Sequence, residues 1–502
     1  MVLDKEVEDK YHERMKQLND GYDLGYDEKK LLSHMLNVTS RIVDGDREDV
    51  PQSFSEATDP NYIGKYGEAT ESELLSILEH DVFDMELYDS VPSNADLVDS
   101  KWVFDIKNVT TGGSKRYKAR LVIRGFLQHY LKSYFDTYSP TSQKDSLREI
   151  LALSAIYILR TIHIDIKTAF LYGELKPEEI LYCKVPDGYC FRNLYQKFCT
   201  PDQRRKFERM LKSGKKGFLR MRKSCYGTKQ AAKNWYEKLD QILIGLGYNA
   251  TPCDPCLYIR WMGNDFILVT GTSEKMFQEL CDGLNQQLEV VNLGEIKQIL
   301  GMVVTHQSNG DILLNNEIYI ENMLMVFDSE STDTKETPAP GESVLSKEDC
   351  IRKEDYDVCV QNRYRSLIGS LLYAAICWRP DIMYRVAQLA RFNGVAGPIH
   401  VKAGNYLLRY LRGTSNWGLF FKGESGGRKI QPIFITSCDA SYAGNEDHIS
   451  VSGWTRQMVD LTDWNNHIVK EDGNVDMLPN FNCTSYSSHR QKGVIATSST
   501  EA

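Results

Sequence analysis

The segment from residue 101 to residue 166 alternates short apolar strands with one amphipathic helix, and this alternation limits the fold more than any other feature of the chain. KWVFDIK (101–107) and RYKARLVIRGF (116–126) have the composition of strands around a Thr-Gly-Gly turn. SLREILALSAIYILR (146–160) has helical periodicity, and TIHIDI (161–166) returns to a strand. Such alternation predicts a mixed α/β domain.

Asp165 is the acidic residue of the last of these strands, which runs directly into KTAFL. A carboxylate buried in a strand needs a strong partner, such as a metal ion. An aspartate at the end of a strand also suits a cap for the following helix. The strand alone leaves both interpretations open.

Further along the chain, the segment 247–269 predicts a hairpin about its Met-Gly-Asn-Asp turn. The polar stretch 328–349 predicts a linker. Helical periodicity then recurs in the three segments 364–376, 381–392 and 400–413, and strands are expected beyond them.

Composition is that of a soluble protein inside the cell. No apolar run reaches membrane-spanning length, and the charged N-terminus lacks the apolar core of a secretory signal. The 12 cysteines form no dense framework, which favours reduced thiols in the cytoplasm or the nucleus. No membrane partner is expected.

The net charge of −9 hides a strong polarity along the chain. Residues 1–100 carry 9 basic and 25 acidic residues, a balance of −16, whereas residues 101–250 carry 29 and 13, a balance of +16. In the basic block, the runs 115–126 and 204–230 interleave Lys and Arg with aromatic residues, which is typical of surfaces that bind phosphate backbones and stack on bases. A solvated basic face is the alternative.

Ordered motifs give the chain a resemblance to one family. KWVF, RYKARLVIRGF, DTYSPTSQKDSLREILALSA, DIKTAFLYGEL, SCYGTKQAAKNWYEKL, NLGEIKQILGM, YRSLIGSLLYAAICWRPDI, LLRYLRGTSNWGL, DASYAG and QKGVIATSSTEA follow one another as in the copia-type LTR-retrotransposon Pol polyprotein. The chain from about residue 50 to residue 502 resembles its reverse transcriptase followed by the N-terminal part of its RNase H.

The resemblance implies an α+β fold: a right-hand polymerase followed by a truncated RNase H-like α/β domain. It implies an acidic arm or connector at 1–90, reverse transcriptase fingers and palm at 91–340, thumb or connection helices at 341–425, and the truncated RNase H-like domain at 426–502. Within the polymerase, the fingers are expected near 101–150 and the palm near 160–300.

The resemblance also implies functional residues. Asp165 would be the first palm carboxylate and a ligand of Mg²⁺. Guanidinium and ammonium groups of the fingers strand would bind the incoming triphosphate, and a palm motif would lie beneath the nucleotide and the template. These nucleotide-binding and nucleic-acid-binding candidates are Lys118, Arg120, Arg124, Tyr226, Gly227, Lys229 and Gln230.

The family pattern is broken at one place. Two magnesium ions must be held by several carboxylates, which the family supplies from a Tyr-x-Asp-Asp hairpin turn. Here Val269 directly precedes Thr270 where that turn is expected, with both flanks in register. We expect an in-frame excision that removes two ligands and one strand of a central hairpin, leaving a sheet edge unpaired. The nearest acids are Asp254, Asp265 and Glu274.

The RNase H region is expected to be incomplete as well. Asp439 in IFITSCDASYAG matches the family's first catalytic and metal-binding acid, although a strand-end turn aspartate is the alternative. The family continues SSTEA with a second glutamate, whereas this sequence ends at Ala502 and Glu501 would point to another helix face.

The resulting expectation is an RNA-directed DNA polymerase with an RNase H region whose catalysis is defective in this copy. The implied cofactor is Mg²⁺. The implied partners are an RNA template, a DNA primer or RNA/DNA hybrid, deoxynucleoside triphosphates and the element's Gag and integrase, in cytoplasmic virus-like particles or in the nucleus. The alternatives are a non-catalytic nucleic-acid-binding remnant or domesticated protein, and a gene fragment without function.

Overall fold

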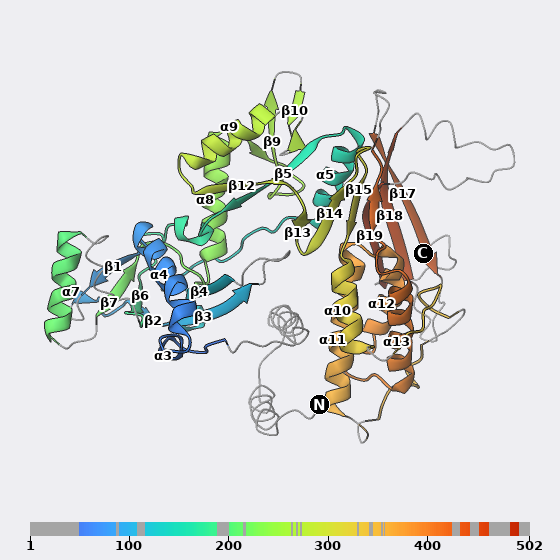
Figure 1. The fold of residues 1–502 in the computed structure, drawn as a ribbon, viewed down its shortest axis with the longest axis horizontal. Helices are drawn as coiled ribbons and strands as arrows, with labels where there is room; N and C mark the ends of the chain where they lie inside the picture. The colour runs from blue at the N-terminus through green and yellow to red at the C-terminus, as the bar shows by residue number, and fades with distance from the viewer. Residues whose placement is uncertain are drawn as a thin grey trace.

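The computed structural model describes residues 50–86, 90–107, 116–187, 200–213, 217–262, 265–267, 270–271, 274–328, 331–340, 345–352, 355, 357–423, 432–441, 451–460 and 482–490. Figure 1 shows four groups of helices and strands, from the N-terminal group at the left to a long antiparallel sheet at the right. The N-terminal 49 residues, the Thr-Gly-Gly turn and the last residues of the chain lie outside this description.

The N-terminal group combines two sheets with three helices. β3 and β4 form a two-stranded antiparallel sheet, and β1, β7, β6 and β2 form a four-stranded one in that order. The elements are α3 (Phe54–Ala57), α4 (Ile63–Glu79), β1 (Phe83–Glu86), β2 (Asp96–Val98), β3 (Ser100–Lys107), β4 (Arg116–Ile123), the 3-10 helix η2 (Gly125–Leu127), β6 (Leu181–Lys184), α7 (Pro201–Ser213) and β7 (Phe218–Met221).

Helix α4 packs against β4 and contributes Tyr66, Leu74 and Ile77 to one apolar core with Leu121 and Ile123. The spacing of these helical residues places them on one face, which the strand covers. The composition had placed residues 50–90 in an acidic arm, but in the structure they supply α3, α4 and β1 to this core. The expected domain boundaries stay predictions.

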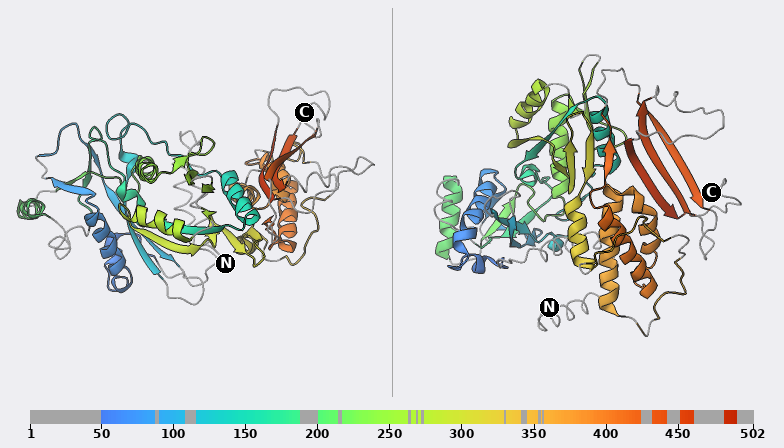
Figure 2. Two further views of the ribbon diagram at one scale, coloured as in Figure 1. Left: turned by 90° about the horizontal axis from the view of Figure 1, so that it is seen from above. Right: turned by 45° about the vertical axis from the view of Figure 1, so that its right-hand side comes forward.

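The central group holds the strand that carries Asp165. β5 (Arg160–Ile166) lies between β11 and β12 in a three-stranded sheet, and β8, β9 and β10 form a second sheet. The other elements are η3 (Ala169–Tyr172), α8 (Ala231–Gly245), β8 (Asn249–Ala250), β9 (Tyr258–Met262), β10 (Asp265–Ile267), β11 (Thr270–Gly271), α9 (Glu274–Asn285) and β12 (Val290–Glu295). The views in Figure 2 show α8 and α9 beside this sheet.

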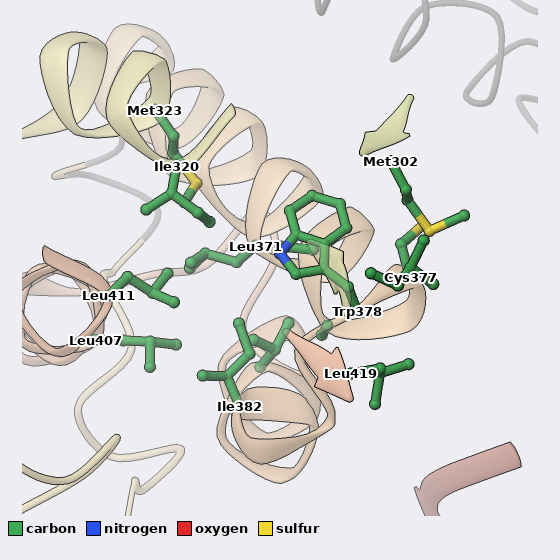
Figure 3. Close-up of a cluster of buried hydrophobic side chains, with 14 of the residues drawn as sticks. Met302, Ile320, Met323, Leu371, Cys377, Trp378, Ile382, Leu407, Leu411 and Leu419 are labelled. Atoms are coloured by element: carbon green, nitrogen blue, oxygen red, sulfur yellow. The ribbon is translucent and has the colours of Figure 1, made fainter. Parts of the chain in front are cut away.

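A third group has the largest core. One face of a four-stranded sheet, β13-β14-β15-β16, and five helices enclose Trp378 and the apolar side chains drawn in Figure 3. The elements are α5 (Lys144–Ile156), β13 (Gln298–Ile299), β14 (Met302–His306), β15 (Ile312–Asn315), α10 (Glu317–Phe327), α11 (Val358–Cys377), the 3-10 helix η5 (Pro380–Ile382), α12 (Met383–Ala390), α13 (Pro398–Gly413) and β16 (Leu419–Phe421).

The C-terminal group is a three-stranded antiparallel sheet in the order β17-β18-β19. β17 (Pro432–Ser441) pairs with β18 (Val451–Asp460), which pairs with β19 (Asn482–Arg490). β19 lies against α5, α12 and β16, so this sheet packs on the third group (Figure 1).

Most of the expected elements are present. The strands at 101–107 and 161–166, the hairpin about Met262 and Asp265, and the three C-terminal helices are confirmed. The helix expected at 146–160 instead ends at Ile156, before the positive φ of 53° at Ile158. The described residues of the segment 328–349 contain no helix or strand. No helix in the described residues is long and apolar enough to span a membrane.

Candidate nucleotide and nucleic-acid site

Asp165 lies near the C-terminal end of β5 and is exposed, which corrects the expectation of a buried carboxylate. The strand alternates, so Ile164 and Ile166 pack on the core between α8 and α9 while His163 and Asp165 point away from it. Asp165 therefore needs no internal partner to offset burial. Its carboxylate faces solvent, where it could contact a ligand.

Tyr226 brings the segment 226–230, called the palm motif below, next to this strand. Its ring packs edge-on against Phe170, which follows β5 in the chain, with ring centroids 5.5 Å apart. The Arg120 guanidinium lies 5.9 Å from the centroid of the same ring, a cation–π arrangement. Burial raises the pKa of Tyr226, and the negative charges of Glu73 and Asp165 raise it further. Asp165, Tyr226 and Arg120 therefore share one neighbourhood.

Gly227 makes a close backbone approach that a larger residue cannot make. A Cβ at this position would lie 2.1 Å from the carbonyl oxygen of Ile123, and the residue has a φ of +91°. A Cβ at Gly125 would lie 2.1 Å from the carbonyl oxygen of Gly227. The two glycines allow the palm motif to rest directly on the end of β4. In the described structure Gly227 therefore positions Tyr226.

Gln230 is buried and joins the palm motif to the loop after η2. Its Oε1 accepts a hydrogen bond from Gln128 Nε2 at 3.1 Å, and its Nε2 donates to the carbonyl oxygen of Ser133 at 2.9 Å. The N–H of Lys229 donates to Gln128 Oε1 at 2.8 Å, and the Lys229 ammonium lies 5.5 Å from the Tyr134 ring centroid. Gln230 thus has a buried structural role, whereas Lys229 is exposed and can meet a phosphate.

Lys118 and Arg124 occupy different settings on the same hairpin. Lys118 lies opposite Asp105 across the β3–β4 pair and, by alternation, on the same face as Arg120. Arg124 follows β4 and pairs with Asp99 at 3.4 Å. The described contacts therefore place Lys118 beside Arg120, and they direct Arg124 toward an acidic partner of its own chain.

Glu73 of α4 belongs to this neighbourhood, although sequence reasoning did not find it. Its Oε1 accepts a hydrogen bond from the N–H of Leu121 at 3.1 Å. Burial raises the pKa of Glu73 to about 7, against the opposing effects of that hydrogen bond and of Arg120. The contact spans 48 residues of sequence, so no local pattern could have indicated it.

The acids nearest to the expected turn are engaged elsewhere. Asp254 is buried, and its carboxylate accepts hydrogen bonds from the backbone N–H groups of Gln143 at 3.0 Å and Cys256 at 2.9 Å. The first of these bonds holds the residue that precedes α5, which makes Asp254 a structural residue. Glu274 forms an ion pair with Arg160.

The described residues do not fit a two-metal centre. Asp265 lies opposite Met262 in the β9–β10 hairpin, and its side chain is outside the description. In the described part of the chain, no group of three or more His, Cys, Asp or Glu side chains could hold a metal ion. Asp165 alone offers too few oxygens and too little charge for two magnesium ions.

In the described residues, the pairing along the β11 edge of β5 is short. The carbonyl oxygen of Thr161 accepts a hydrogen bond from the N–H of Ile296 at 2.9 Å, and the N–H of Lys167 donates to the carbonyl oxygen of Glu289 at 3.0 Å. The odd-numbered residues of this segment therefore turn their backbone groups toward β12. The even-numbered residues turn theirs to the opposite edge, where β11 pairs only with Arg160 and Thr161. The residues on both sides of β11 lie outside the description, so the expected unpaired edge stays a prediction.

Asp439 lies apart from these residues, in β17 of the C-terminal sheet, opposite Gly453 of β18. Its side chain is outside the description, and Glu501 and Val269 lie in segments that are not described at all. The catalytic role of Asp439 therefore stays a prediction.

Residues 84–205 and 207–340 match the family described as reverse transcriptase (RNA-dependent DNA polymerase). The chain belongs to this reverse transcriptase family.

Similar proteins agree with that assignment. The chain is 32% identical over 81% of its length to the Retrovirus-related Pol polyprotein from transposon TNT 1-94 of Nicotiana tabacum, and it covers 29% of that protein. It is 28% identical over 82% of its length to the corresponding polyprotein from transposon RE1 of Arabidopsis thaliana, of which it covers 25%. It is also 26% identical over 68% of its length to a putative transposon Ty5-1 protein of Saccharomyces cerevisiae, of which it covers 96%.

These relatives confirm the resemblance to the copia-type retrotransposon Pol polyprotein. The chain spans between a quarter and a third of the plant polyproteins that it matches.

Proposed function

We propose that the chain is the reverse transcriptase region and part of the RNase H-like region of a copia-type Pol polyprotein. It binds a primed RNA or DNA template and deoxynucleoside triphosphates. Its magnesium-dependent nucleotidyl transfer is defective, because Asp165 lacks the carboxylate partners that a two-metal reaction needs. The observation that carries this proposal is that the nearest described acids are engaged elsewhere: Asp254 accepts backbone hydrogen bonds from Gln143 and Cys256, and Glu274 pairs with Arg160.

Basic and aromatic side chains near β5 support the proposed binding surface. Arg120 and Lys118 share one face of the β3–β4 pair, and Tyr226 supports Arg120 beside the end of β5. Lys229 is exposed on the neighbouring loop. Guanidinium groups suit phosphate oxygens, and aromatic rings suit stacked bases.

Primer extension on poly(rA)·oligo(dT) with Mg²⁺ tests the catalytic part of this proposal. We expect no incorporation above background by the chain as it stands. A second variant carries the family's Tyr-x-Asp-Asp turn with its flanking strands, inserted between Val269 and Thr270. We expect this insertion to restore incorporation, and Asp165→Asn within it to abolish that incorporation again. Extension by the original chain that Asp165→Asn abolishes would show that the site is intact.

The alternative function is nucleic-acid binding without chemistry, as in a domesticated protein. The +16 balance of residues 101–250 favours it. Raising salt from 50 to 200 mM should weaken hybrid binding roughly a hundredfold if about four phosphates are contacted. Binding that is insensitive to salt would contradict both functions.

The genomic DNA across the codons for Val269 and Thr270 separates a true excision from an error in the gene structure. A transcribed segment at that point that encodes the Asp-Asp turn would make full polymerase activity the leading function.

The strand order of the C-terminal sheet and the position of Asp439 support an RNase H-like assignment. An antiparallel β17-β18-β19 sheet with Asp439 on its first strand suits the beginning of an RNase H-like domain, with the two-metal chemistry that this implies. Cleavage of the RNA strand of a labelled hybrid, and its loss on Asp439→Asn, would test this assignment. The proposed setting is a cytoplasmic virus-like particle with the element's Gag and integrase.

A further inference from the structure

The outer edge of β4 is covered by side chains and by the palm motif. Among the described strands β4 pairs only with β3, so its other edge presents backbone groups that need partners. At Leu121 the N–H donates to Glu73 Oε1 at 3.1 Å, and the carbonyl oxygen accepts from Cys225 Sγ at 3.7 Å. At Ile123 the N–H donates to the carbonyl oxygen of Tyr226 at 2.7 Å. Glu73 therefore completes an edge that the palm motif covers only in part.

This edge adjoins the proposed triphosphate site. Arg120 directly precedes Leu121, and its guanidinium lies on the ring of Tyr226. In the described structure, the charged and titratable groups set against the Glu73 carboxylate are Arg120 of β4 and the side chains of Cys225 and Tyr226. Burial raises the pKa of both the thiol and the phenol, so these two stay neutral near pH 7. Arg120 is the cation of this set.

The carboxyl group of Glu73 titrates near neutral pH. Burial raises the pKa of its carboxyl to about 7, although the N–H of Leu121 and the charge of Arg120 act in the opposite direction. A triphosphate bound by Arg120 would bring several negative charges into the same neighbourhood and would oppose ionisation further. Binding and protonation are then coupled reciprocally.

We propose that Glu73 is a positioning residue of the triphosphate site: it fixes the edge of β4 beside Arg120, offsets the guanidinium charge above neutral pH in the absence of nucleotide, and becomes more protonated when a triphosphate binds. This inference rests on the proposed function, because it assumes that Arg120 contacts the triphosphate. It adds α4, which precedes the segment 84–205 matched by the family, to the nucleotide site.

Calorimetric titration of dTTP into the full chain bound to poly(rA)·oligo(dT) tests the inference without requiring catalysis. The pH series runs from 5.5 to 8.5 for the unmodified chain, Glu73→Gln and Glu71→Gln. Glutamine keeps an oxygen that can accept from Leu121 but cannot ionise. Glu71 is exposed on the same helix, so its variant changes the net charge equally and serves as the matched control.

At pH 8 we expect Glu73→Gln to bind dTTP roughly threefold to tenfold more tightly than the unmodified chain, as expected for removing one charge about 10 Å away. At pH 5.5 the difference should vanish, and Glu71→Gln should follow the unmodified chain throughout. Equal pH profiles for all three proteins would overturn the inference.

Proton uptake gives a second measurement that needs no variant at Glu73. Titrations of the unmodified chain at pH 7 in buffers of different ionisation enthalpy should show uptake beyond that of dTTP itself, and the absence of this excess would also overturn the inference. Arg120→Ala separates the two proposals. Unchanged dTTP affinity in that variant would contradict the assigned function of Arg120, whereas a loss of affinity leaves the pH profiles to decide the role of Glu73.

Discussion

The buried carboxylate of Asp96 accepts two hydrogen bonds from His129, one from the ring nitrogen Nδ1 and one from the backbone N–H, each 2.7 Å long. Ser133 Oγ donates a third, at 2.5 Å. These contacts hold the loop that also carries Gln128, the partner of the palm motif. Asp96 therefore links β2 to the candidate nucleotide site.

Replacing Asp96 with alanine should destabilise the chain by on the order of 3 kcal/mol, because the donors of His129 and Ser133 lose a buried charged acceptor. Urea unfolding at pH 7 measures the effect. Asp136→Ala, which removes an exposed carboxylate from the same loop, is the control and should leave the unfolding midpoint almost unchanged. Equal effects of the two substitutions would contradict the structural role of Asp96.

The same carboxylate predicts a pH dependence. Burial opposes ionisation, but the hydrogen bonds from Ser133 and His129 outweigh it and lower the pKa of Asp96 below its ordinary value of 3.8. A lowered pKa contributes stability above 3.8 that is lost as the pH falls through the folded-state pKa. The stability difference between the unmodified chain and Asp96→Asn should therefore shrink below pH 4, which melting temperatures can follow.

Gly227→Ala should cost about 2 to 4 kcal/mol and displace Tyr226, since the new methyl group would overlap the Ile123 carbonyl oxygen and the positive φ would be strained. Thermal unfolding and dTTP binding should both deteriorate. Gly64→Ala is the matched control, because nothing lies within 4 Å of a Cβ there and the residue is in helix α4. That control should be neutral or slightly stabilising.

Glu73→Gln should raise the melting temperature at pH 8 and leave it unchanged near pH 4. The carboxyl has its pKa raised from 4.5 to about 7, so the folded chain holds its proton more tightly than the unfolded chain. Stability is then fully present below pH 4.5 and is lost as the pH rises through about 7. A melting-temperature difference that is constant between the two pH values would contradict this prediction.

Arg379→Lys should destabilise the chain by about 2 to 4 kcal/mol, since an ammonium group cannot reproduce a buried guanidinium fork. The Arg379 side chain is 1% exposed, and it donates to Asp381 at 2.7 Å and to the carbonyl oxygen of Thr414 at 2.8 Å. Differential scanning calorimetry measures the loss. Arg391→Lys is the control, because Arg391 is exposed at the C-terminal end of α12, and it should be nearly neutral.

The sequence predicted the secondary structure of this site better than its contacts. The alternation in β3, β4 and β5 is local, so the strands and the shared face of Lys118 and Arg120 could be inferred from spacing. The exposure of Asp165 follows from the same alternation, because Ile162, Ile164 and Ile166 form the apolar face of β5 and Asp165 lies on the other face.

Long-range contacts explain the rest of the difference. The acidic composition of residues 1–100 hid an amphipathic helix whose Glu73 reaches Leu121. Gly227 was expected to bind nucleotide, but its close approach to Ile123 is visible only when two distant segments are placed together. Periodicity indicates which side of an element is apolar, and it does not indicate which element covers that side.

The pairing of β5 with two distant strands also orders the events of synthesis and folding. The β3–β4 pair can form as soon as its own residues are available, because its partners are close in sequence. The strand that carries Asp165 must instead wait for Glu295 to leave the ribosome before its pairing with β12 is complete. Contacts of such long sequence separation form slowly. During translation, Asp165 is thus made early and fixed in place late.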